Sequence, residues 1–267
     1  MTKQDFSWLK KKLEERTKEQ VKEALSDRCV QVVKAVSSMS ALEESFNLLL
    51  ESVKEWYSIH FPELERLCTD KEFYLELIKE IGLKENFSEK NIMNYKKDSK
   101  LALQIVEKAK NSIGSPIQDT DLQRIQKLAE YALKLKKERE TLGVYIERIM
   151  EKELPNFTLL ATPLIGAKLL AMAGSKRKLA LMPASTIQLL GAEKALFRHL
   201  NTGNKPPKYG YLYQHPFVVK AKRESKGKIA RTLSGKLSLA LKADYFGGEA
   251  NGKRLEKEME ARIKELG

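Results

Sequence analysis

Glycine and proline are both absent from the first 61 residues of this chain. Residues 5 to 56 are instead rich in Glu, Lys, Leu and Gln, which are good helix formers. Glycine and proline are the residues that most often interrupt a helix, so nothing in this stretch stops one from continuing. The stretch therefore predicts one long helix or two consecutive helices.

A heptad repeat follows later in the chain and predicts a coiled coil. The repeat consists of Leu128, Leu135, Leu142 and Ile149, with Ala132 and Ile146 on the adjoining seam. A preceding helix, which Ser88 can cap and which runs towards Asn111, offers a matching apolar stripe. We expect these two helices to form an antiparallel hairpin with its tip near residues 113 to 120. The alternative is ordinary helix packing within one globule.

The tip of such a hairpin would expose apolar side chains to water, and homodimerisation would cover them. The candidate dimerisation residues are Ile113, Ile117, Leu122, Leu128 and Leu135.

The composition changes after Pro155 to small and apolar residues, which allow helices to approach each other closely. The predicted architecture is all-α: a long antiparallel coiled-coil hairpin on a helical body, and a compact second domain of short helices. The expected segments are a helical extension (1–26), a helical and coiled-coil dimerisation domain (27–155), the compact domain (156–250) and a charged tail (251–267). The tail is expected to be a solvated helix or a frayed end.

Positive charge is concentrated in one segment. The whole chain has 49 Lys and Arg against 36 Asp and Glu, a formal net charge of +13. Residues 176 to 236 contain 14 of the basic residues and only two acidic ones, Glu193 and Glu224, so the remainder of the chain is nearly neutral. This distribution predicts a nucleic-acid partner, or another anionic one, for the compact domain.

The segment from Pro183 to Leu200 is the best candidate for a binding helix. Ser185 or Thr186 can cap it, and an apolar face is expected along it. That face comprises Ile187, Leu189, Leu190, Leu196, Phe197 and Leu200. The candidate contact residues are Gln188, Gly191, Ala192, Glu193, Lys194 and Arg198. Small side chains at two of these positions would let a partner approach the backbone, and the two cations can reach phosphates. An ordinary charged surface helix is the alternative.

The following loop, residues 201 to 213, adds Lys205 and Lys208, and a later basic run adds Arg231. Tyr209, Tyr211, Tyr213 and His215 could stack on unpaired bases or, with equal weight, belong to the core.

Signals for catalysis are weak, and we expect neither a cofactor nor a metal. Residues 247 to 254 resemble a phosphate-binding loop, but Arg254 stands where Ser or Thr is required. The three histidines lack zinc spacing, and the basic segment lacks paired carboxylates for a nuclease. Cys29 and Cys68 are too few for a disulfide framework, which favours a reducing cytosolic compartment. No membrane span or export signal is expected.

Four consecutive candidate contact residues, Gly191, Ala192, Glu193 and Lys194, resemble the Gly-Ala-Glu-Lys signature of the Nop family. Residues 56–64, 173–175, 228–231 and 243–246 are also similar to segments of that family, so the resemblance covers roughly residues 27 to 250. The compact segment is therefore identified as a Nop domain, similar to that of archaeal scaffolds of box C/D small ribonucleoproteins.

This resemblance implies a non-enzymatic RNA-binding scaffold and a set of partners. In the family, the Nop domain recognises a kink-turn RNA together with the ribosomal-type protein already bound to it, and the coiled coil pairs two copies as a homodimer. The scaffold supports box C/D guide-directed 2′-O-methylation of RNA by fibrillarin, including rRNA processing. The resemblance implies a cytoplasmic location in an archaeal cell, or a nucleolar one in a eukaryote. The remaining alternatives are a Nop-type pre-mRNA splicing component and a generic RNA-binding subunit of a nucleic-acid enzyme.

The family's fibrillarin-binding domain is an α/β domain that precedes the matching region. Only about 26 residues precede that region here, which is too few for such a domain. Direct fibrillarin contact is therefore not expected of this chain, and truncation of a longer natural protein is a hypothesis that the intact mass of the natural product would test.

Overall fold

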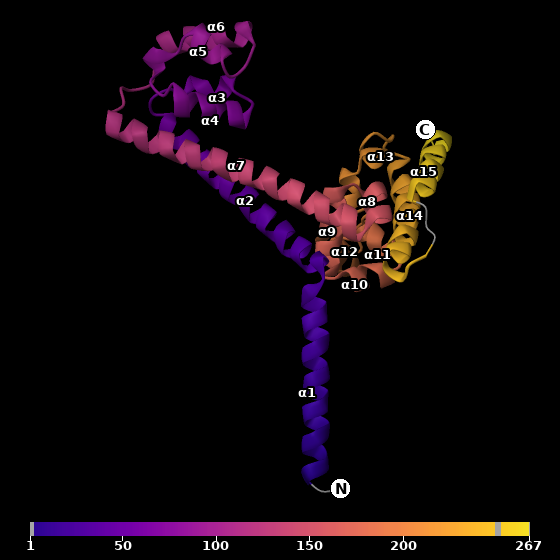
Figure 1. Ribbon diagram of the computed structural model, residues 1–267. Helices are drawn as coiled ribbons and strands as arrows, with labels where there is room; N and C mark the ends of the chain where they lie inside the picture. Colours follow the sequence, from indigo (N-terminus) through magenta and orange to yellow (C-terminus); the bar gives the residue numbers. More distant parts are fainter. Residues whose placement is uncertain (1–2, 249–251, 267) are drawn as a thin grey trace. The chain divides into compact units, whose positions relative to one another are not determined.

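The computed structural model describes residues 3–248 and 252–266, and every regular element within those ranges is a helix (Figure 1). The prediction of an all-α chain is confirmed. The chain divides into two compact units: unit 1 comprises Met1–Ser38 and Gly143–Gly267, and unit 2 comprises Met39–Leu142.

The glycine-free and proline-free N-terminal stretch forms two helices, α1 (Lys3–Ser26) and α2 (Arg28–Tyr57). Asp27 separates them, and its Oδ1 accepts a hydrogen bond from the backbone N–H of Cys29 at 2.9 Å. This is the bond by which an aspartate caps the first turn of a helix, so Asp27 starts α2 at the point where α1 ends.

Unit 2 contains a set of short helices together with parts of α2 and of the 35-residue α7 (Asp119–Glu153). The short helices are α3 (Glu63–Leu67), α4 (Lys71–Glu80), η1 (Lys84–Asn86), α5 (Glu89–Met93) and α6 (Ser99–Lys110). Ser88 caps α5 as expected, because its side chain accepts from the backbone N–H of Asn91. The single helix predicted from Ser88 to Asn111 is wrong, since α5 ends at Met93 and Asp98 caps a new helix.

In unit 2, α7 packs against α2 and also contacts α4, where Gln126 donates to the carbonyl oxygen of Ile78 and Lys136 pairs with Glu72. One hydrophobic cluster contains Phe46 and Leu50 of α2 with Ile125 and Ala129 of α7. The predicted partner, the helix ending near Asn111, is the 12-residue α6, which contributes Ala102, Ile105 and Ala109 to the same cluster but is too short to pair with the 35-residue α7 along its length.

The heptad leucines are not at the centre of this packing. Leu128 and Leu135 are only half-buried, whereas Ala129 and Ala132 are fully buried. Arg139 of α7 carries a charge beside this packing, and its Nε lies 2.5 Å from the Glu43 carboxylate of α2. A charged side chain at that position is therefore paired.

Buried His60 anchors the loop between α6 and α7. Its Nε2 accepts a hydrogen bond from the backbone N–H of Lys84 at 3.0 Å, which leaves Nδ1 to donate to the carbonyl oxygen of Ser115 at 2.9 Å. Both ring nitrogens are used, so the neutral ring connects two segments that are distant in sequence.

Glu63 also holds this loop. Its carboxylate accepts hydrogen bonds from Ser112 Oγ at 2.7 Å and from the backbone N–H of Ile113 at 3.1 Å. Gly114 fits because it has no side chain: a Cβ there would lie 1.9 Å from the carbonyl oxygen of His60. Residues 112–115, with His60 and Glu63, form what we call the loop clamp.

Unit 1 is built around α14 (Lys226–Phe246), which packs against α8, α10, α11, α13 and α15. Besides α1 and parts of α2 and α7, unit 1 contains α8 (Pro155–Ala161), α9 (Pro163–Ala173), α10 (Lys176–Leu181), α11 (Ala184–Leu189), α12 (Glu193–Thr202), η2 (Tyr211–Gln214), α13 (Pro216–Val219) and α15 (Gly252–Leu266). Asp244 of α14 caps α8 by accepting from the backbone N–H groups of Asn156 and Phe157, at 3.2 and 2.8 Å.

The charged C-terminal segment differs from the expected solvated helix or frayed end. Its helix α15 packs against α8 and α14, with Leu255 and Met259 buried. The backbone N–H of Gly252 also donates to Asn156 Oδ1 at 2.9 Å. The expected domain boundary at residue 250 lies in the stretch 249–251, outside the described residues.

Among the described residues, no single helix has the length and apolarity of a membrane span. The pair α8 and α9 meets the composition criterion together, but it is bent by 112°.

Candidate nucleic-acid interface

The predicted binding helix is interrupted at the Gly-Ala-Glu-Lys motif. Helix α11 ends at Leu189 and α12 begins at Glu193. Between them, Gly191 has a φ of +87°, in the left-handed region that disfavours residues with a Cβ. The Glu193 carboxylate accepts from the backbone N–H of Gly191 at 2.8 Å. The motif therefore encodes a turn, residues 190–192, and the start of the next helix.

The space beside Gly191 is already occupied. A Cβ at this position would lie 2.6 Å from the ring of Tyr211, so the glycine permits close contact with that ring. Its predicted role was to let a partner approach the backbone. The contact with the Tyr211 ring instead explains why this position has no side chain.

Gln188 was expected to face a partner, but its side chain is buried, with 9% exposed. Its Nε2 donates to the carbonyl oxygen of Lys208 at 2.6 Å. The backbone repeats the connection, because the N–H of Gly210 donates to the carbonyl oxygen of Gln188 and that of Tyr211 to Leu190, at 2.9 and 2.8 Å. Gln188 therefore points into the domain and cannot contact a ligand in this conformation.

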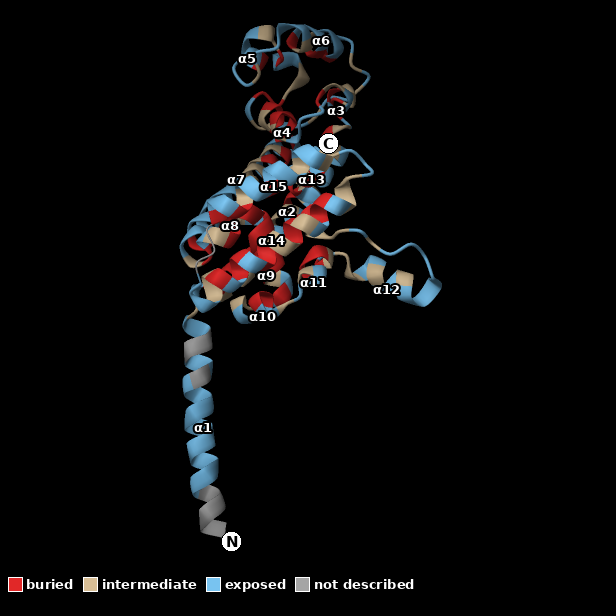
Figure 2. Cartoon of the chain, turned by 90° about the vertical axis from the view of Figure 1, so that its right-hand side faces the viewer, coloured by how far each residue is buried: buried red, intermediate tan, exposed pale blue. Residues whose placement is uncertain are grey.

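Helix α12 has no buried residue, and Figure 2 shows it without the red of the core. Lys194 and Arg198 are exposed and lie one helical turn apart. Phe197 and Leu200, two members of the expected apolar face, have 62% and 68% of their surface exposed. The expected single apolar face is therefore divided: Ile187 of α11 and Leu190 of the turn are buried, whereas Phe197 and Leu200 on α12 face solvent beside the basic face.

A shallow cavity of about 490 Å³ lies where the turn meets α12. Its lining comprises Gly191, Ala192, Glu193, Lys194, Ala195, Arg198 and Tyr211. Five of the nine predicted contact residues therefore share one concave surface.

The predicted cations have no acidic partners in the part of the chain that the structure describes. Lys194, Arg198, Lys205, Lys208 and Arg231 are all exposed, and none forms an ion pair there. On α7, by contrast, Lys127 and Lys134 both pair with Glu130. Unpaired cations keep their field available to an anionic ligand.

The aromatic residues of the loop take different places. The rings of Tyr209 and Tyr213 stack with centroids 5.1 Å apart, and Tyr213 remains half-exposed beneath the ammonium of Lys226, 4.9 Å from its centroid. His215 is buried and belongs to the core. Tyr213 therefore remains a candidate for stacking on a base, and His215 does not.

Burial also lowers the pKa of His215. The ring accepts at Nδ1 from the N–H of Phe217 and donates from Nε2 to the carbonyl oxygen of Leu160, at 3.2 and 2.8 Å. The unfolded chain binds a proton at His215 at a higher pH than the folded chain does. The contribution of the neutral His215 ring to the free energy of unfolding is therefore complete above the pKa that His215 has in the unfolded chain. It is lost as pH falls through the lowered folded-state pKa.

We therefore expect the free energy of unfolding to decrease more steeply below about pH 6.5 in the wild type than in His215→Gln, which keeps an amide donor but cannot titrate. Urea unfolding of both proteins at about pH 7.5 and about pH 5 measures the difference. Equal pH dependence in the two proteins would contradict the assignment.

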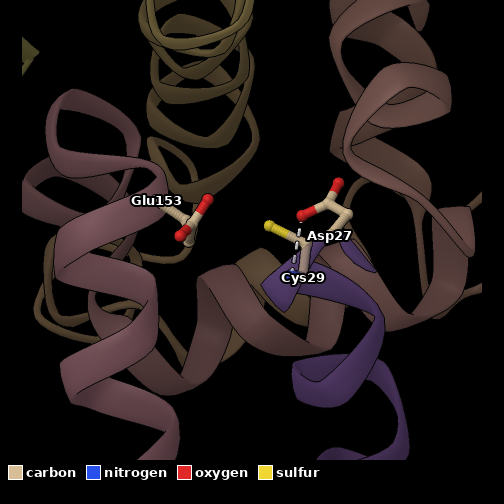
Figure 3. A group of neighbouring side chains, drawn as sticks. All are labelled: Asp27, Cys29 and Glu153. Carbon is tan, nitrogen blue, oxygen red and sulfur yellow. Dashed lines mark hydrogen bonds between the residues drawn. The ribbon is translucent and has the colours of Figure 1, made fainter. Parts of the chain in front are cut away.

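One group of side chains has metal-ligating atoms within 4.8 Å of one another: Asp27, Cys29 and Glu153 (Figure 3). Asp27 already caps α2, and Glu153 pairs with Lys176 at 3.5 Å. Burial, with the nearby Asp27 charge, raises the pKa of the Cys29 thiol to about 12, so it stays protonated. These roles explain the group without an ion, and we assign no metal to it. The loop-like segment 247–254 falls partly outside the described residues.

The candidate dimerisation residues lie in unit 2 and differ widely in exposure. Ile113, which belongs to the loop clamp, has 88% of its surface exposed. Ile117, Leu128 and Leu135 are half-buried, and Leu122 lies in the core. Leu122 is therefore not available to a partner.

The sequence reasoning missed two contacts of the site: that of Gly210 with Leu190, and that of Gly191 with the ring of Tyr211, which was considered only as a stacking or core residue. A Cβ at Gly210 would lie 1.9 Å from the carbonyl oxygen of Leu190. The contact joins segments about twenty residues apart through backbone groups, and no local spacing predicts it.

Comparison with known proteins identifies the family of this chain. Residues 38–265 match the family model Nop, described as "snoRNA binding domain, fibrillarin". The chain belongs to the Nop family. The matched region contains the turn at Gly191, all of α12 and the loop clamp, and it extends into α15, to one residue before the end of that helix.

Individual Nop relatives support the assignment. A NOP5 family protein of Methanocaldococcus jannaschii is 42% identical over 252 residues, which cover 94% of this chain and 60% of that protein. Nucleolar protein 58 of Candida albicans is 38% identical over 218 residues, covering 82% of this chain and 42% of that protein. The chain thus spans 60% or less of these relatives. A crystal structure of a fibrillarin/Nop5p complex contains a similar chain, with a TM-score of 0.56 and 25% sequence identity. The match covers 100% of this chain and 81% of the chain in that structure.

Proposed function

We propose that this Nop chain is a non-enzymatic scaffold of a box C/D ribonucleoprotein. Its candidate interface binds a kink-turn RNA together with the ribosomal-type protein already bound to that RNA. In this role it supports guide-directed 2′-O-methylation by fibrillarin, the partner named with Nop5p in the similar crystal structure.

The observation that carries the proposal is the pair of adjacent faces on α12. Lys194 and Arg198 form an exposed basic face without acidic partners in the described chain, which suits phosphates. Phe197 and Leu200 form an exposed apolar face, which suits a protein surface. A ligand that is RNA alone would use only the first face, and a composite ligand uses both.

The three candidate contact residues that follow α12 in the chain are also cations. Lys205 and Lys208 belong to the loop that follows α12, and Arg231 is exposed on α14. The stem of Lys208 lies against the start of α14, with its Cδ 3.5 Å from the position of a Cβ at Gly227. These cations extend the basic surface from α12 towards α14.

The test is a titration of a labelled kink-turn box C/D RNA with this chain, with and without the ribosomal-type protein, at two salt concentrations. Binding that is at least about tenfold tighter to the preformed complex supports composite recognition. Equal binding to any RNA would overturn it and leave a generic RNA-binding subunit.

We also propose that two copies pair through unit 2, with Ile113, Ile117, Leu128 and Leu135 in the contact and Leu122 left out. The large exposure of Ile113 on a fixed loop supports this surface. Sedimentation equilibrium over a range of protein concentrations tests it, and a monomer throughout would contradict it.

A further inference from the structure

The loop that contains Lys205 and Lys208 is held at both ends. We call residues 203–210 the lysine loop. At its start, the His199 ring bonds the carbonyl oxygen of Asn204, and Gly203 ends α12 with a φ of +67°. Pro206 and Pro207 restrict its middle. At its end, the backbone of Lys208 accepts from Gln188 at 2.6 Å.

The two segments that the Gln188 hydrogen bond joins are closely packed against each other. Gly210 and Gly191 have no side chain, and a Cβ on either would lie within 2.6 Å of Leu190 or Tyr211. At Gly210 the two segments pack backbone against backbone, and at Gly191 the backbone packs against the Tyr211 ring. The Gln188 amide is the one side-chain donor recorded on the Lys208 carbonyl in the described structure.

We propose that Gln188 is a positioning residue that fixes Lys208 relative to Lys194 and Arg198 before any ligand arrives. The inference rests on the proposed function, because it assumes that these cations bind phosphates. Gln188 itself touches no ligand. A buried hydrogen bond to a backbone carbonyl sets where the loop leaves the turn, and the lysine stem lying against Gly227 then sets where the ammonium can reach.

The direct test is Gln188→Met, which keeps the length and lacks the donor. We expect binding of the preformed RNA–protein complex to weaken about threefold to tenfold, the usual effect of one lost hydrogen bond. Gln123→Met makes the same chemical change at an exposed residue of α7 and should alter binding less than about twofold.

A double-mutant cycle separates positioning from general stabilisation. If Gln188 acts through Lys208, Gln188→Met has less than about a twofold effect in a Lys208→Ala background. It keeps its full effect in a Lys194→Ala background, because Lys194 lies on α12 and not on the lysine loop. An equal loss in all three backgrounds would overturn the proposal.

A second measurement needs no RNA. In Gln188→Met, hydrogen exchange of the Gly210 and Tyr211 amides, which donate to Gln188 and Leu190, should accelerate about tenfold, while that of α14 core amides stays unchanged. Unchanged exchange at both amides would refute the positioning role. If the wild-type chain fails to bind the preformed complex, the proposed function fails, and this exchange result still decides whether Gln188 fixes the loop.

Discussion

Reversing two charges on α12, in Lys194→Glu with Arg198→Glu, is expected to weaken binding to the preformed RNA–protein complex by at least about a hundredfold. Two favourable phosphate contacts are lost, and two like charges are brought against the RNA backbone. Helix content should not change, because both side chains are exposed and α12 buries none of its residues. Fluorescence anisotropy measures the binding and circular dichroism the helix content.

The control variant is Arg124→Glu with Lys137→Glu on α7. It changes the formal net charge by the same amount, also replaces one arginine and one lysine, and alters exposed residues of unit 2. It should bind about as well as the wild type at moderate salt. If both variants lose affinity equally, the field of the whole chain governs binding and α12 is not the site.

Gly191→Ala should destabilise unit 1 by about 3 kcal/mol, the sum of about 1 kcal/mol for a side chain in the left-handed region and about 2 kcal/mol for overpacking. The overpacking arises because the new Cβ would lie 2.6 Å from the Tyr211 ring. Urea unfolding followed by circular dichroism gives the change.

Gly203→Ala provides a matched comparison, since Gly203 also has a positive φ, +67°, but a Cβ there meets nothing within 4 Å. This variant should lose only about 1 kcal/mol. Equal losses in the two variants would show that backbone strain alone acts at Gly191 and that the Tyr211 contact is unimportant.

The charge distribution and the family signature led from the sequence to the candidate interface, but the inward or outward direction of individual side chains needed the structure. The spacing of Phe197 and Leu200 correctly marks an apolar face. Burial of that face depends on whether another element covers it, and no local pattern carries this information. Gln188 is the opposite case, because a polar residue near a basic patch is usually exposed, whereas its partner is a carbonyl twenty residues away.

The helical pairing was misassigned for a related reason. The heptad spacing predicts Leu128 and Leu135 at the centre of the packing, but both are half-buried, whereas Ala129 and Ala132 are fully buried in the cluster that α7 shares with α2. Of these two alanines, Ala132 belongs to the predicted seam and Ala129 does not. Buried α2 residues also follow alternating spacings of three and four, and Phe46, Leu50, Val53 and Tyr57 are one section of that stripe. Glu43 interrupts the stripe in sequence, and its pairing with Arg139 explains why both charges are accommodated.

The loop clamp has a consequence for association at Ile113. Ordering a free backbone costs about 1–2 kcal/mol of conformational entropy per residue. His60 and Glu63 have already restricted residues 112–115 during folding, with bonds across about fifty residues of sequence. A surface that docks on Ile113 therefore meets an apolar side chain on a backbone that is already ordered, and most of its contact energy remains available as affinity.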